Sequence, residues 1–75
     1  MNNKKRDRLR KALSLISEAT DIVSDVLYEE RDCLDNMPEN LSSSERYEAM
    51  ENAIDNLENA VDHLSEASEA IGETL

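Results

Sequence analysis

A single proline, Pro38, divides this chain into two long stretches that repeat apolar residues at helical spacing. Both stretches alternate spacings of four and three residues, which is the heptad pattern of helices that pack along their length. The repeating positions of the first stretch are Leu9, Leu13, Ile16, Thr20, Val23, Leu27, Glu30 and Leu34. Those of the second are Tyr47, Met50, Ile54, Leu57, Val61, Leu64, Ser68, Ile71 and Leu75. The sequence therefore predicts an all-α fold.

Pro38 predicts where the first helix ends. A proline lacks the amide hydrogen that a helix needs, and it also pushes the preceding residue, Met37, towards extended geometry. We therefore expect a helix over residues 4–36, a connector over 36–42 and a second helix over 43–73.

The start of the second helix carries several capping residues. Ser42 and Glu45 have the spacing of a capping box, and Ser43 and Ser44 offer alternative caps. Because the connector is short, the two helices should lie antiparallel. The predicted fold is a coiled-coil-like antiparallel two-helix hairpin that forms a single domain over residues 1–75.

The apolar surface is wider than a seam between two helices requires. Ala12, Ala19, Val26 and Cys33 run beside the first seam at intervals of seven, and Leu15 and Ile22 widen the same side. A row of alanines runs beside the second seam. A second copy could cover this surface, giving a four-helix bundle of two chains. The predicted interface with the second copy or another partner consists of Leu15, Ala19, Ile22, Val26, Ala53, Ala60 and Ala67.

The length of 75 residues also favours self-association. So short a chain builds a marginal core, which is usually aided by disulfides, a metal or oligomerisation. Cys33 is the only cysteine, so no disulfide can form within the chain. We expect Cys33 to be a buried thiol in the reducing cytoplasm. No apolar run approaches the ~20 residues that span a bilayer, so we expect a soluble protein without membrane contact.

Catalytic and metal-binding patterns are missing. His63 falls on a predicted solvent face, in the half of the second helix that lies far from Cys33, so no Cys-His nucleophile pair is indicated. A di-iron bundle needs a Glu three residues before a His, where this chain has Ala60. A calcium loop needs a central Gly that the acidic stretches lack. We therefore expect no enzyme activity, no metal and no cofactor.

The net charge of −10 is spread unevenly. The second helix carries an acidic face made of Glu51, Asp55, Glu58, Asp62, Glu66 and Glu69. One interpretation is a solvated surface that resists aggregation. The other is a docking surface for a basic partner, with the carboxylates imitating a nucleic-acid backbone. Direct binding of nucleic acid is not expected, because an acidic surface repels it.

Residues 1–11 form a basic head with six Lys and Arg side chains against one acid, Asp7. In an antiparallel hairpin this head should lie beside the end of the second helix, where Glu66, Glu69 and Glu73 would neutralise it. The alternative is contact with phosphates or acidic lipids.

The connector and the helix start resemble a known group of proteins. The stretches concerned read Asp-Asn-Met-Pro-Glu-Asn-Leu-Ser-Ser-Ser-Glu-Arg-Tyr-Glu over residues 35–48 and Ala-Ile-Asp-Asn-Leu-Glu over 53–58. They resemble small acidic helical-hairpin proteins of uncharacterised function from Gram-positive bacteria and their phages and mobile elements. This resemblance implies a protein that inhibits or adapts a host protein. It also points to Met37, Leu41 and Tyr47, which would form either an apolar tip for a partner or a cap on the end of the bundle.

Three functions follow as hypotheses. The first is a non-enzymatic, homodimeric adaptor or inhibitor that binds a protein with a basic or apolar groove. The second is an acidic nucleic-acid mimic that inhibits a nucleic-acid-binding or defence enzyme of the host. The third is a structural element that assembles only with itself. Binding by a mimic should weaken steeply with salt, whereas apolar binding should tolerate salt.

Overall fold

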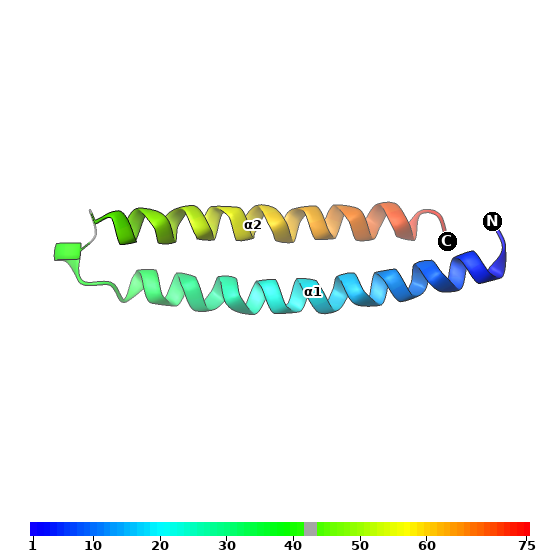
Figure 1. Cartoon of the computed structure of the whole chain (residues 1–75), viewed down its shortest axis with the longest axis horizontal. Coiled ribbons are helices and arrows are strands. Elements are labelled where there is room, and N and C mark those ends of the chain that lie inside the picture. The colour runs from blue at the N-terminus through cyan, green and yellow to red at the C-terminus, as the bar shows by residue number, and fades with distance from the viewer. Residues whose placement is uncertain (42–43) are drawn as a thin grey trace.

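The computed structural model describes residues 1–41 and 44–75, and it confirms an all-α helical hairpin. Helix α1 spans Asn3–Asp35, a short 3₁₀ helix, η1, spans Glu39–Leu41, and helix α2 spans Glu45–Gly72. In Figure 1 the two long helices run antiparallel side by side, with both chain termini at one end and η1 at the other. The described residues contain no β-strand.

Capping side chains fix the limits of α1 close to those predicted. The Asn2 side-chain oxygen accepts a hydrogen bond from the Lys5 N–H at 2.8 Å, which satisfies one of the free amides of the first turn. At the other end the Asn36 side-chain amide donates to the Asp32 carbonyl, also at 2.8 Å. Helix α1 therefore begins and ends one residue earlier than the heptad pattern predicted.

The start of α2 is set by Ser44, whose hydroxyl oxygen accepts a hydrogen bond from the Tyr47 N–H at 3.2 Å. Helix α2 consequently begins at Glu45, two residues later than expected. The capping box predicted at Ser42, and the alternative cap Ser43, lie outside the described residues.

The hairpin is a thin rod of 59 × 15 × 13 Å. Its radius of gyration of 17.2 Å exceeds the value of about 11 Å expected for a compact chain of this length.

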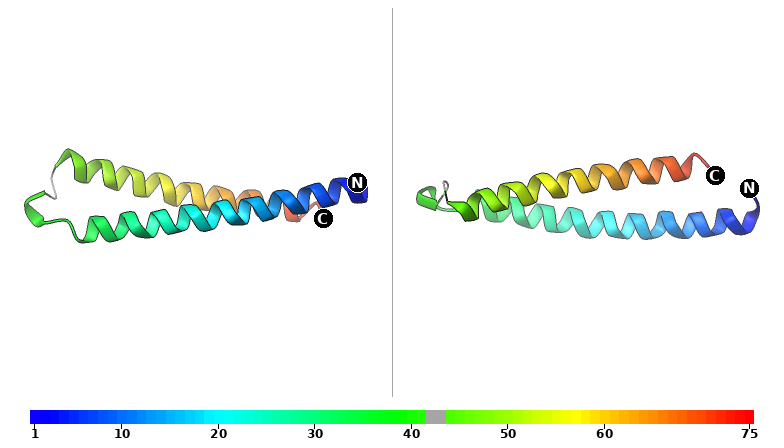
Figure 2. Two further views of the ribbon diagram at one scale, coloured as in Figure 1. Left: turned by 60° about the horizontal axis from the view of Figure 1, so that its bottom comes forward. Right: turned by 45° about the horizontal axis from the view of Figure 1, so that its top comes forward.

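The alignment of the two helices is marked by two features. Arg31 on α1 forms an ion pair with Glu58 on α2, and Ile16 and Ser68 together line a shallow hollow. Figure 2 shows that the helices cross at a shallow angle. Because α1 has 33 residues and α2 has 28, the first turns of α1 project beyond α2 (Figure 1).

The core between the helices is narrow. Among the described residues only Leu27 and Ile54 are buried, each with 7% of its surface exposed; the other apolar seam residues are half-buried, except Leu75, which is exposed. The polar seam residue Thr20 is satisfied locally, because its hydroxyl donates to the Ile16 carbonyl at 2.7 Å. Two helices alone can enclose little more than the line where they touch.

The total accessible surface of the hairpin is larger than a compact chain of its mass would expose. The hairpin exposes 5820 Å². A compact monomer of 8.5 kDa would expose roughly 4,700 Å², so the excess is about 1,100 Å². Neither long helix has an apolar stretch sufficient to cross a membrane.

Candidate interaction surface

Helix α1 carries an apolar strip made of Leu15, Ala19, Ile22 and Val26, in which the three large side chains are exposed and Ala19 is half-buried. Leu15 is 54% exposed, Ile22 is 64% exposed and Val26 is 41% exposed. The strip follows helical spacing, but it lies roughly a quarter of a turn away from the seam that contacts α2. These large side chains therefore point away from the only neighbour that the hairpin provides.

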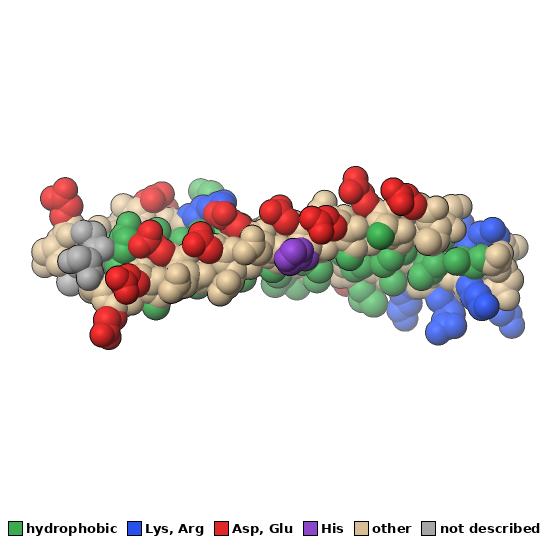
Figure 3. All heavy atoms as spheres, turned by 90° about the horizontal axis from the view of Figure 1, so that it is seen from above, with side chains coloured by type: hydrophobic (Ala, Val, Ile, Leu, Met, Phe, Trp, Pro, Cys, Tyr) green, Lys and Arg blue, Asp and Glu red, His purple; other side chains and the backbone are tan. Residues whose placement is uncertain are grey.

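Helix α2 contributes a row of small side chains beside its own seam. Ala53 and Ala60 are half-buried and Ala67 is exposed. In antiparallel helices this row and the apolar strip flank the seam from the same side, and together they form what we call the apolar face. Figure 3 agrees, since hydrophobic side chains gather along one long edge of the rod. The predicted interface residues are thus brought together on one surface.

Cys33 is exposed, so the prediction of a buried thiol was wrong for the hairpin. Its position explains the difference. Cys33 lies seven residues after Val26 and continues the apolar strip, which α2 does not cover. The thiol would be shielded only by a partner on the apolar face.

The predicted acidic face lies on the other side of α2. Figure 3 shows acidic side chains along the long edge opposite the hydrophobic one. Five of its members, Glu51, Asp55, Asp62, Glu66 and Glu69, are exposed. The sixth, Glu58, is half-buried because it pairs with Arg31 across the seam. Glu58 therefore stabilises the hairpin and is less available for docking than its neighbours.

His63 lies near this face and is solvated, as predicted. Its side chain is 76% exposed, and its Nδ1 is 3.8 Å from a carboxylate oxygen of Glu66. Within residues 1–41 and 44–75, no group of three His, Cys, Asp or Glu side chains is placed to hold a metal ion.

The connector tip is described only in part. Met37 and Tyr47 are half-buried, whereas the side chain of Leu41 lies outside the described residues. The Met37 N–H donates to the Leu34 carbonyl at 3.1 Å, which holds the connector against the end of α1. Met37 and Tyr47 thus pack partly against this end of the hairpin.

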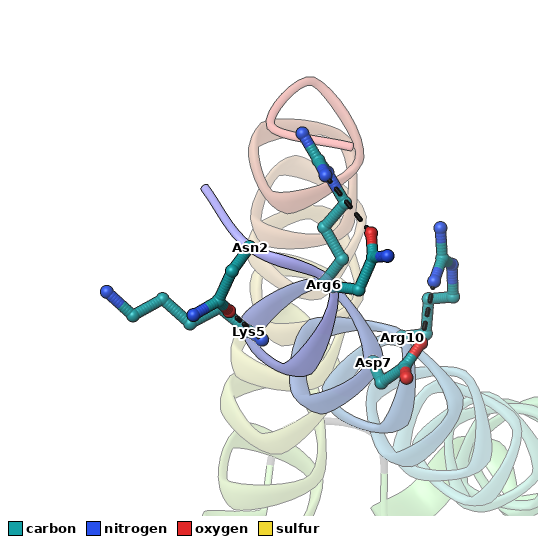
Figure 4. Close-up of polar contacts among 6 residues, drawn as sticks. Asn2, Lys5, Arg6, Asp7 and Arg10 are labelled. Carbon is teal, nitrogen blue, oxygen red and sulfur yellow. Dashed lines mark hydrogen bonds and ion pairs between the residues drawn. The ribbon is translucent and has the colours of Figure 1, made fainter.

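In the part of the chain that the structure describes, no ion pair joins the basic head to the acids of α2, so the predicted neutralisation was wrong. Its polar contacts stay within α1, as Figure 4 shows. Arg10 pairs with Asp7 at 2.8 Å, and the Arg6 guanidinium donates to the Asn3 side-chain oxygen at 3.4 Å. Two causes are visible: the first turns of α1 extend past α2, and the acidic face points away from them.

Part of the basic head belongs to a surface that the sequence interpretation missed. Lys4, Arg8 and Lys11 precede Leu15 at spacings of four, three and four residues. They therefore continue the line of the apolar strip towards the N-terminus. Extending the strip's spacing backwards from Leu15 would have found them in the sequence.

The chain was compared with protein-family models, with curated proteins and with solved structures, and none of these comparisons found a match. A functional argument therefore depends on the geometry of the hairpin itself. Its most distinctive element is the apolar face, because the large aliphatic side chains of Leu15, Ile22 and Val26 meet solvent in the middle part of α1.

Proposed function

We propose that this chain is a non-enzymatic binding protein that works as a homodimer of helical hairpins. Two copies cover each other's apolar faces and form a four-helix bundle, which then binds another protein as an adaptor or inhibitor. The mechanism is occupancy of a surface, without chemistry. The observation that carries this proposal is the exposure of Ile22 and Leu15, at 64% and 54%, in the middle of the longest helix.

The exposed area is large enough for a stable dimer. A standard protein interface buries about 800 Å² on each partner. The hairpin's surface exceeds that of a compact chain of its mass by about 1,100 Å², so one such interface would bring it near the ordinary value. Apolar burial stabilises by roughly 25 cal/mol per Å². A core with only Leu27 and Ile54 buried gains much from that contribution.

Leu15→Ser combined with Ile22→Ser tests the dimer. We expect light scattering to give about twice 8.5 kDa for the wild type and a single or unfolded chain for the variant. Ser17→Asn combined with Asp21→Asn changes two exposed residues of the same helix outside the apolar strip, and should leave the dimer intact. A wild-type mass of one chain, or an unchanged mass for the serine variant, would contradict the proposal.

The resemblance to proteins of bacterial mobile elements suggests that the bound protein belongs to the host, with a basic or apolar groove. A cytoplasmic location fits the exposed thiol of Cys33, which an oxidising compartment would tend to modify. No direct contact with nucleic acid or membrane is proposed.

A second candidate function is mimicry of nucleic acid by the acidic face. It is supported by Asp55, Asp62 and Glu69, which are exposed and form no ion pair in the described part of the chain. Neutralising these three carboxylates to the amides should abolish capture of a basic host protein if mimicry operates. An adaptor that uses apolar contacts should keep its partner at high salt. A structural element should capture only copies of itself.

A further inference from the structure

Three kinds of side chain follow one another along a single line on α1. Lys4, Arg8 and Lys11 come first, the apolar strip from Leu15 to Val26 comes next, and Glu29 and Cys33 end the line. Glu30 lies beside that end and is half-buried. Figure 3 shows hydrophobic side chains in the middle of this edge and basic ones at its terminal end.

Arg8, Lys11 and Glu29, at the charged ends of this line, form no ion pair with any residue that the structure describes. In the described residues the ion pairs are Arg10–Asp7, Arg31–Glu58 and the long His63–Glu66 contact. Arg8, Lys11 and Glu29 take part in none of them and are exposed. The charges that flank the apolar strip are therefore free to meet charges on another molecule.

The order along α1 is basic, then apolar, then acidic. A second copy of α1 places opposite charges against these ends only if it runs in the opposite direction. We infer that two copies pair apolar face to apolar face with their α1 helices antiparallel, so that the basic head of each copy lies on the acidic end of the other copy's α1. This inference rests on the homodimer proposed above and adds its geometry. The two connectors would lie at opposite ends of the bundle.

The positions along α1 make this pairing specific. The apolar strip is centred between residues 20 and 21. Antiparallel pairing about that centre sets Leu15 opposite Val26 of the partner subunit. The same register sets Lys11 level with Glu30 of the partner subunit. Arg8 then lies about one helical turn from Glu29 of the partner subunit.

Parallel pairing of the hairpins would also cover the apolar face, but it would bring like charges together. The α1 strip of one copy would rest on the alanine row of the other, which is sterically acceptable. Both basic heads would then lie at one end of the bundle, and both acidic connector ends at the other. Like charges brought within about 10 Å repel at physiological salt. The charge order, rather than the apolar contact, therefore selects the antiparallel arrangement.

Cys33 makes the arrangement measurable in the full chain, because it is the only cysteine and is exposed. A nitroxide attached to it reports the distance between copies by pulsed electron paramagnetic resonance. Antiparallel pairing about residues 20–21 predicts roughly 40 Å between the two labelled positions, at 1.5 Å per residue. Parallel pairing puts them on adjacent or diagonal helices, about 10–15 Å apart.

The label distance and the oligomeric mass together test the antiparallel geometry and the homodimer. A distance near 40 Å supports the antiparallel dimer. A dimeric mass with a short distance overturns the antiparallel geometry and leaves the homodimer standing. A monomeric mass for the unlabelled wild type overturns both.

Charge reversal tests the same contact without a label. Arg8→Glu with Lys11→Glu should raise the dimer dissociation constant about tenfold at low salt, because attractive pairs become repulsive. Arg6→Glu with Arg10→Glu changes the net charge equally on another side of α1 and should have a much smaller effect. Adding Glu29→Lys and Glu30→Lys to the first variant should restore dimerisation. The inferred contact would be overturned if the two double variants raised the dissociation constant equally. It would also be overturned if the added lysines did not restore dimerisation.

Discussion

Two isoleucines provide a matched test of which surfaces are covered. Ile54 on α2 is 7% exposed, and Ile22 on α1 is 64% exposed. Replacing each by alanine removes the same atoms from a helix. The two substitutions therefore differ mainly in the surroundings of the side chain.

The expected magnitudes follow from burial. Ile54→Ala should cost about 2–5 kcal/mol of unfolding free energy, since it removes a core side chain and leaves a cavity. In a lone hairpin Ile22→Ala should cost less than about 1 kcal/mol, because full burial of isoleucine stabilises by roughly 1.5–3 kcal/mol and only a third of this side chain is covered. The better helix propensity of alanine offsets part of that loss. In the proposed dimer Ile22 is covered in each copy, and its truncation should cost about 1–3 kcal/mol per chain.

Urea unfolding followed by circular dichroism separates these cases when it is repeated over a hundredfold range of protein concentration. A dimer should gain up to about 2.7 kcal/mol of apparent stability over that range, by mass action. Ile22→Ala should reduce this gain, whereas Ile54→Ala should lower stability at every concentration. A cost near zero for Ile22→Ala throughout would refute the dimer. A large cost at dilutions where only single chains exist would refute the exposure of Ile22 in the hairpin.

Three further predictions concern the stability of the hairpin. Ser44→Ala removes the cap of α2 and should cost about 1 kcal/mol in thermal unfolding, and an unchanged midpoint would contradict the capping role. Gly72→Ala should stabilise by up to about 1 kcal/mol, because an added Cβ meets nothing within 4 Å and the backbone φ is not positive; a lower midpoint would contradict this. Removing the Arg31–Glu58 pair, whose side chains are about half exposed, should cost less than about 1 kcal/mol, measured by a double-mutant cycle. A coupling that survives 1 M salt would contradict a solvent-screened pair.

Several features of the fold could be predicted from the sequence because they depend on local rules. Heptad spacing indicated both helices, and Pro38 indicated the break between them. The start of α2 was displaced by two residues, because consecutive serines offer equivalent hydroxyl groups and local sequence does not choose among them. Side-chain spacing also identified the apolar strip on α1, since helical geometry fixes which residues share a side.

The surroundings of Cys33 and of the basic head could not be predicted in the same way. Burial of Cys33 was expected because it lies beside the seam, but the row that contains it turns away from α2. Neutralisation of the basic head was expected because the chain termini meet, yet α1 extends past α2 there. Both outcomes depend on the rotation and relative length of two packed helices.

The sequence by itself determined two amphipathic helices, a tight reversal between them and an apolar surface wider than one seam. These properties follow from helical periodicity and from proline, which act over a few residues. Only the tertiary structure decided that Cys33 on this surface stays exposed, and that the basic head extends past α2 instead of meeting its acids. The physical reason is that an antiparallel partner fixes which side of each helix remains open to solvent.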